Sequence, residues 1–168
     1  IEAARPVVVC PDCPQALENL AGQLQPLPLA QAVITTQNAW LMDSMMRDVI
    51  QRGTGQRARA LGRSDLAGKT GTTNDQKDAW FCGYNPSLVA VAWVGFDRLE
   101  PLGRGETGGR AALPMWMSYM GDALKGSPVR RRQQPEGMVT VRIDPRSGLL
   151  ARSGQADGIF ETFRADSV

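Results

Sequence analysis

The spacing of apolar side chains predicts two helices. Apolar residues recur every three or four positions near residues 37–52, with Thr35 or Thr36 as a cap, which indicates an amphipathic helix. Gly53 follows, at a position where a left-handed residue commonly ends a helix. A second apolar helix is predicted near residues 113–125, because it has a proline in its first turn and a glycine after its end.

Between these helices, three runs have the pattern of β-strands. They are residues 66–73, 79–84 and 88–96, and turn-forming residues separate them, so an antiparallel meander is expected. The third run is apolar on both alternating faces, which is typical of a strand covered on both sides. Cys82, in the middle run, is expected to be a small core residue. The predicted fold class is therefore α+β, with an antiparallel sheet flanked by helices.

The pattern divides the chain into three parts. Residues 1–36 are proline-rich and irregular, and residues 37–126 contain the helices and the sheet. Residues 127–168 begin with a basic, solvated linker, and then residues 138–143 alternate as a strand. A turn at residues 144–148 leads from this strand into residues 149–151. We expect this last part to form a β-hairpin extension appended to the main sheet.

Composition excludes several classes of function. The 168 residues include 19 Lys and Arg against 17 Asp and Glu, a net charge of +2 that is too balanced for a nucleic-acid-binding protein. No apolar stretch approaches the roughly 20 residues of a membrane span. The chain has no histidine, which excludes Ser-His-Asp, Cys-His and His-metal chemistry built from its own residues. We expect no metal and no cofactor.

The cysteine pair Cys10 and Cys13 has C-x-x-C spacing, which leaves three interpretations open. The pair forms a structural disulfide or two inert thiols in a loop. Alternatively it is half of a zinc site, which would need two more ligands, or it is a redox motif, for which the proline after Cys13 is a poor context.

The polar chemistry of the chain gathers in the strand at residues 69–73. Alternation places Thr70 and Thr72 on one face, where two hydroxyls can bind a carboxylate, and Lys69 adds a positive charge. Gly71 has no side chain, so another backbone can approach it, and a backbone N–H here can stabilise an oxyanion. Taken alone, a Lys-Thr-Gly tripeptide is a weak signal.

The surrounding sequence closely resembles penicillin-binding proteins, in particular the transpeptidase domain of the bifunctional class A type. The resemblance is strong over residues 31–126 and looser in the tail. The segments that carry it are KTGTTND (69–75), DAWF (78–81), GY (83–84), WVG (93–95), QNAWLM (37–42), GTG (53–55) and GETGGRAALPMW (105–116).

The resemblance implies a D,D-transpeptidase that cross-links peptidoglycan stem peptides and is acylated by β-lactams. In that family a serine in an S-x-x-K motif attacks the penultimate D-alanine, an S-x-N motif assists proton transfer, and K-T-G lines the cleft. Only K-T-G occurs here, and the chain opens at Ile1 rather than methionine. We therefore expect a C-terminal fragment that is inactive alone and whose partner is the missing N-terminal part of the same protein.

The resemblance also implies a location and a role for each residue. The parent protein would sit in the bacterial inner membrane, anchored upstream and facing the oxidising periplasm, which is compatible with a disulfide at Cys10 and Cys13. Lys69 would meet the substrate carboxylate and polarise the S-x-N serine, Thr70 and Thr72 would bind that carboxylate, and the Thr72 N–H would form half of the oxyanion hole. The predicted catalytic residues are Lys69 and Thr72, and the predicted substrate-binding residues are Thr70, Gly71, Thr72 and Thr73.

Two other functions remain open at this point. One is a non-catalytic interaction module that keeps a transpeptidase-like sheet. The other is a serine β-lactamase, which shares the K-T-G strand, although residues 105–116 resemble the biosynthetic enzymes instead.

Overall fold

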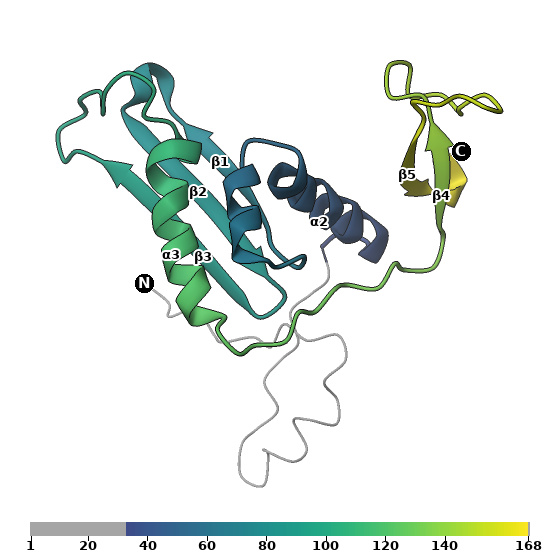
Figure 1. Cartoon of the computed structure of the whole chain (residues 1–168), viewed down its shortest axis with the longest axis horizontal. Helices are drawn as coiled ribbons and strands as arrows, with labels where there is room; N and C mark the ends of the chain where they lie inside the picture. Colours follow the sequence, from purple (N-terminus) through teal and green to yellow (C-terminus); the bar gives the residue numbers. More distant parts are fainter. Residues whose placement is uncertain (1–32, 168) are drawn as a thin grey trace, which may run out of the picture. The chain divides into compact units, whose positions relative to one another are not determined.

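The computed structural model describes residues 33–167, so the predicted irregular segment 1–36 lies almost entirely outside the described residues. The main elements, shown in Figure 1, follow in chain order as helix α2 (Thr36–Gln51), strands β1 (Ala67–Thr72), β2 (Asp78–Asn85) and β3 (Leu88–Gly95), helix α3 (Leu113–Ala123), and strands β4 (Met138–Ile143) and β5 (Ile159–Arg164). Shorter helical turns lie at Gln56–Leu61, Asn74–Gln76, Gly108–Ala112 and Ala165–Ser167, of which Gly108–Ala112 is π-helical and leads directly into α3. None of the described helices has both the length and the apolar character needed to cross a bilayer.

Both predicted helices are confirmed, but the expectation for Gly53 is wrong. Gly53 does not adopt a positive φ, whereas Gly126, which follows α3, does, at φ +77°. Gly53 is small for a different reason. A Cβ there would lie 2.8 Å from the Cα of Val49, so the chain turns back tightly over the last turn of α2.

The predicted meander is confirmed as a three-stranded antiparallel sheet in the order β1-β2-β3. Its register pairs Thr70 with Phe81, and Lys69 with Cys82. Because opposite residues share a face and neighbours alternate, Thr70 and Phe81 point to one side of the sheet, while Lys69 and Cys82 point to the other.

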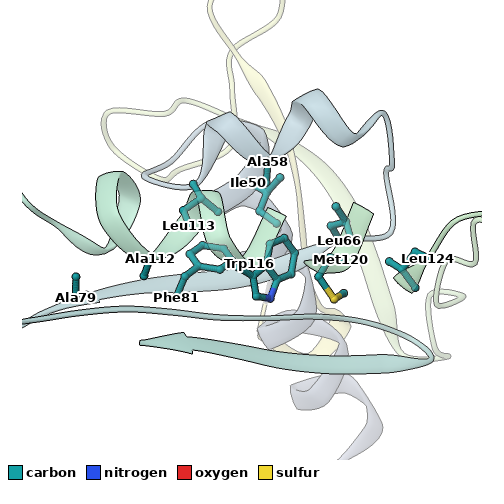
Figure 2. Close-up of a cluster of buried hydrophobic side chains, with 10 residues drawn as sticks. All are labelled: Ile50, Ala58, Leu66, Ala79, Phe81, Ala112, Leu113, Trp116, Met120 and Leu124. Carbon is teal, nitrogen blue, oxygen red and sulfur yellow. The ribbon is translucent and has the colours of Figure 1, made fainter. Parts of the chain in front are cut away.

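The core lies on the Phe81 side of the sheet. Phe81 and Trp116 of α3 are buried and meet edge to face, with ring centroids 4.8 Å apart. The Trp116 indole N–H donates to the carbonyl of Ala90 at 3.1 Å, so its one polar atom is satisfied. Figure 2 shows the buried apolar cluster that joins the helices to the sheet: Ile50, Ala58, Leu66, Ala79, Phe81, Ala112, Leu113, Trp116, Met120 and Leu124.

The opposite face is open, which corrects two expectations. Strand β3 is not covered on both sides, because Val89 and Val91 are 72% and 56% exposed, and Trp93 is 44% exposed. Cys82 is likewise exposed rather than a core residue. The physical reason is that α3 packs only on the Phe81 side of the sheet, and none of the described segments buries the other side of β3.

A buried ion pair fixes the chain that leaves α3. Arg63 binds Asp65 through two hydrogen bonds of 3.0 and 2.7 Å and also donates to the carbonyl of Ser127 at 2.9 Å. Burial alone would raise the pKa of Asp65, but hydrogen bonds from Arg63, the Arg130 backbone N–H and Asn85, with the charge of Arg63, lower it. The predicted linker is therefore tied to the start of β1.

The C-terminal hairpin pairs residues 138–143 with residues 159–164 rather than with residues 149–151 after the expected turn, and it does not join the main sheet. Strands β4 and β5 form a separate two-stranded sheet, in which the hydroxyls of Thr140 and Thr162 lie 2.9 Å apart. The segment after the turn contributes only one bridge to this sheet, between Ile143 and Leu150.

Candidate active site

Strand β1 is an edge strand of the described sheet. It pairs with β2 along one side, and no described strand occupies its other side. Lys69 is exposed, and its ammonium lies 3.0 Å from the carbonyl oxygen of Thr70 and 3.5 Å from the Thr70 hydroxyl. Lys69 and Thr70 point to opposite faces, so the ammonium must reach around the free edge of β1. It therefore places a positive charge at that edge.

The two predicted carboxylate-binding hydroxyls lie on the same face and are each held by another segment. The Thr70 hydroxyl is 2.7 Å from that of Thr54, in the loop after α2. The Thr72 hydroxyl accepts a hydrogen bond of 3.0 Å from the backbone N–H of Gly108. Because this bond uses a lone pair, the Thr72 hydroxyl proton remains available to a ligand.

The π-helical turn Gly108–Ala112 begins over Gly71, near the end of β1, and Trp80 of β2. A Cβ on Gly108 would overlap the carbonyl oxygens of Gly71 and Trp80, so only glycine fits there. The backbone of Gly108 lies against the backbone of Gly71, whereas a Cβ on Gly71 would meet the Trp80 side chain at 3.2 Å, so the expected role of Gly71 in admitting another backbone stays a prediction. π-Helical turns within helices are frequent at functional sites.

Thr73 lies at the end of the strand and its hydroxyl is engaged locally. It accepts a hydrogen bond of 2.8 Å from the backbone N–H of Asp78, closing the turn between β1 and β2. Asp75 and Gln76 in this turn have positive φ, and the Gln76 side chain accepts a 2.6 Å bond from the Gly105 N–H. The turn is thereby tied to the loop that leads to Gly108.

Together these groups bring hydrogen-bond donors and one positive charge to the same part of β1. An ammonium and two hydroxyls, one of them with its proton free, are donors that suit a carboxylate. Among the described residues, no group of three or more His, Cys, Asp or Glu side chains could hold a metal ion. The pair Cys10 and Cys13 lies outside the described residues.

A hollow of about 740 Å³ opens elsewhere, among the loops of the β4–β5 hairpin, and none of the predicted site residues lines it.

The sequence analysis did not predict two residues that shape the candidate site, Thr54 and Gly108. Both residues lie in segments that carry the family resemblance, GTG (53–55) and GETGGRAALPMW (105–116), but the resemblance was not used to assign either residue a place in the site.

Comparisons with known proteins agree on one family. The model of the penicillin-binding protein transpeptidase domain matches residues 7–98. Penicillin-binding protein 1A of Pseudomonas aeruginosa is 54% identical over 144 residues, which cover 86% of this chain and 17% of the relative. Penicillin-binding protein 1A of Vibrio cholerae is 41% identical over 189 residues, covering 97% of this chain and 23% of the relative.

A solved structure gives the same result. The 2.6 Å crystal structure of penicillin-binding protein 1A from Haemophilus influenzae matches with a TM-score of 0.76 and 38% identity, over 83% of this chain and 22% of that one. The chain thus spans about a fifth of the length of these relatives. The α+β fold expected from the sequence is confirmed, and the chain belongs to the penicillin-binding protein transpeptidase family.

Proposed function

We propose that this chain is the C-terminal part of a peptidoglycan D,D-transpeptidase domain and that β1 binds the terminal carboxylate of the stem peptide. The observation that carries the proposal is the donor set at the free edge of β1: the Lys69 ammonium, the Thr70 hydroxyl beside it and the Thr72 hydroxyl held by Gly108. The fold alone would not distinguish a transpeptidase from other proteins with a similar sheet.

Substrate binding follows from an edge strand with anion-binding side chains. An extended peptide can add to the free edge of β1 as a further strand, with backbone hydrogen bonds fixing its direction. Its terminal carboxylate then accepts hydrogen bonds from Thr70 and Thr72 and is paired with the charge of Lys69. Thr73 holds the end of the strand through the Asp78 N–H, and Gly71 presents no side chain to the ligand.

The chemical step is acyl transfer. A serine attacks the carbonyl carbon of the penultimate D-alanine, and the negative charge on the carbonyl oxygen is stabilised by the Thr72 backbone N–H together with that of the serine. The C–N bond breaks, and the terminal D-alanine leaves as the amine with the serine's proton. The amine of a second stem peptide then attacks the acyl-enzyme ester, which forms the cross-link and returns a proton to the serine.

A β-lactam acylates the same serine by the same first step. Its carboxylate occupies the same donors, and attack on the ring carbonyl breaks the ring C–N bond. The nitrogen stays covalently attached to the acyl group, so it does not leave the site and the acyl-enzyme persists.

We further propose that the serine lies in a part of the protein outside this chain. The chain contains neither S-x-x-K nor S-x-N, and it spans about a fifth of its relatives, so alone it would be inactive. Removal of a catalytic nucleophile abolishes acyl transfer, whatever carboxylate binding remains. The parent protein would also be a glycosyltransferase, with its catalytic part on the periplasmic side of the inner membrane.

Labelling with a fluorescent penicillin tests this function. The full-length protein should acquire a stable covalent label that unlabelled penicillin prevents. Rapid hydrolysis of the antibiotic would instead support a serine β-lactamase, and neither labelling nor hydrolysis would support a non-catalytic interaction module.

A further inference from the structure

Thr54 has no role in the function proposed above, yet its hydroxyl is part of the site. It belongs to the loop between α2 and the turn at Gln56–Leu61, and its oxygen lies 2.7 Å from that of Thr70. The same loop packs under the π-helical turn, because a Cβ on Gly109 would lie 3.1 Å from the Thr54 carbonyl oxygen. The contact therefore joins segments that are distant in sequence.

The hydrogen-bonding capacity of the Thr70 hydroxyl indicates what this contact does. A hydroxyl has one proton to donate and two lone pairs to accept with. Lys69 can only donate, and its ammonium lies 3.5 Å from the Thr70 oxygen. If the Thr54 hydroxyl donates as well, both lone pairs of Thr70 face protein donors, and its proton is left for a ligand.

We propose that Thr54 is a positioning residue for carboxylate recognition: its hydroxyl donates to Thr70 and turns the Thr70 proton toward the ligand. The inference rests on the proposed function of β1. Thr72 is oriented in the same way by the Gly108 N–H. Each of the two ligand-binding hydroxyls thus has a protein donor that keeps its proton free.

The test exploits the charge of the ligand. Hydrogen bonds to an ionised acceptor are about twice as strong as those to a neutral one, so an oriented hydroxyl favours a free carboxylate over its ester. In the full-length protein we would measure second-order acylation rate constants for one penicillin as the free acid and as its methyl ester. The variants are Thr54→Val and Thr54→Ala, which remove the hydroxyl, and Thr54→Ser, which keeps it.

The matched control is Thr140→Val, which breaks a second threonine hydroxyl pair, the one between β4 and β5. We expect the acid-to-ester ratio to fall about tenfold in Thr54→Val and Thr54→Ala, the factor typical of one hydrogen bond to a charged group. Thr54→Ser should restore the ratio, and Thr140→Val should leave it unchanged.

Three results would overturn the inference: an unchanged ratio in the valine and alanine variants, equal losses for acid and ester, or failure of Thr54→Ser to restore the ratio. Equal losses would assign Thr54 a purely structural role. A wild-type protein that neither compound acylates would contradict the proposed function instead, so the two failures are distinguishable.

Discussion

At the scale of single residues, Tyr84 shows how the sheet holds the helix that precedes the site. Its hydroxyl donates to Asp43 of α2 at 3.1 Å. Burial, and then the charge of Asp43 and this hydrogen bond, raise the pKa of Tyr84 to about 12. The contact helps to fix α2, whose end leads into the loop that carries Thr54.

This pKa gives a pH dependence with a definite sign. Because the folded-state pKa is raised, the contribution of Tyr84 to stability is fully present below the ordinary value of about 10 and is lost as the pH rises toward 12. In the full-length protein with ¹³C-labelled tyrosine, NMR follows the ionisation of Tyr84, and a Tyr84→Phe variant assigns its signal. We expect a midpoint near pH 12, and a midpoint near pH 10 would contradict the contact.

Some residue-scale features could be predicted from sequence and others could not. The strand period of two is enough to place Thr70 and Thr72 on one face, and the structure agrees. The contact between Thr54 and Thr70 depends on how a loop folds back over a sheet, which local spacing does not reveal. Gly53 had the sequence context of a helix-ending glycine, but its small size serves a close approach to Val49 instead.

At the scale of elements, the meander could be predicted because turn residues separate the three strands, but the exposure of β3 could not. An apolar strand has the same pattern whether its second face is covered or open, so the exposure of Val89 and Val91 needed the structure. The π-helical turn could not be predicted from the sequence either. Adjacent glycines indicate a flexible loop as readily as a tight approach to Gly71.

Substitution of Gly108 tests that close approach. We expect Gly108→Ala to push the π-helical turn away from β1, lower stability by about 1–3 kcal/mol, and slow penicillin acylation through loss of the bond to Thr72. Thermal unfolding and acylation rates of the full-length protein measure both effects. Gly121→Ala in α3 is the control, since its Cβ meets only the flexible end of Leu61 at 3.3 Å. Equal behaviour of the two variants would argue against a tight fit at Gly108.

At the scale of the whole molecule, the main feature is the face of the sheet opposite α3, which none of the described segments buries. Exposed apolar side chains on β3 adjoin Cys82 on β2, and contiguous apolar surface of this kind commonly marks a contact with another segment. The relatives are about five times longer than this chain. We therefore expect the rest of the domain to cover this face.

Alkylation of Cys82 tests this expectation. In the folded full-length protein the thiol should react slowly with a maleimide, because the covering segment buries it. Unfolding in denaturant should make it fully reactive, which serves as the internal control. Mass spectrometry of the peptide that contains Cys82 measures the extent of reaction. Fast alkylation in the folded state would show that this face remains open.

We propose above that the free edge of β1 recognises a carboxylate through Lys69. Two variants, Lys69→Ala and Lys77→Ala, test this recognition most directly. Lys77, in the turn between β1 and β2, is the matched control because its ammonium forms a long pair of 3.8 Å with the exposed Asp75, away from Thr70 and Thr72. Both Lys69→Ala and Lys77→Ala should unfold within about 0.5 kcal/mol of the wild type, as surface substitutions usually do.

The decisive measurement is the second-order rate constant for penicillin acylation of the full-length protein carrying each variant. We expect Lys69→Ala to lower it by about tenfold to a hundredfold, because a hydrogen bond between charged groups contributes about 1.5–3 kcal/mol, while Lys77→Ala acylates at the wild-type rate. Equal rates for the two variants would show that Lys69 is an ordinary surface lysine and would contradict the account.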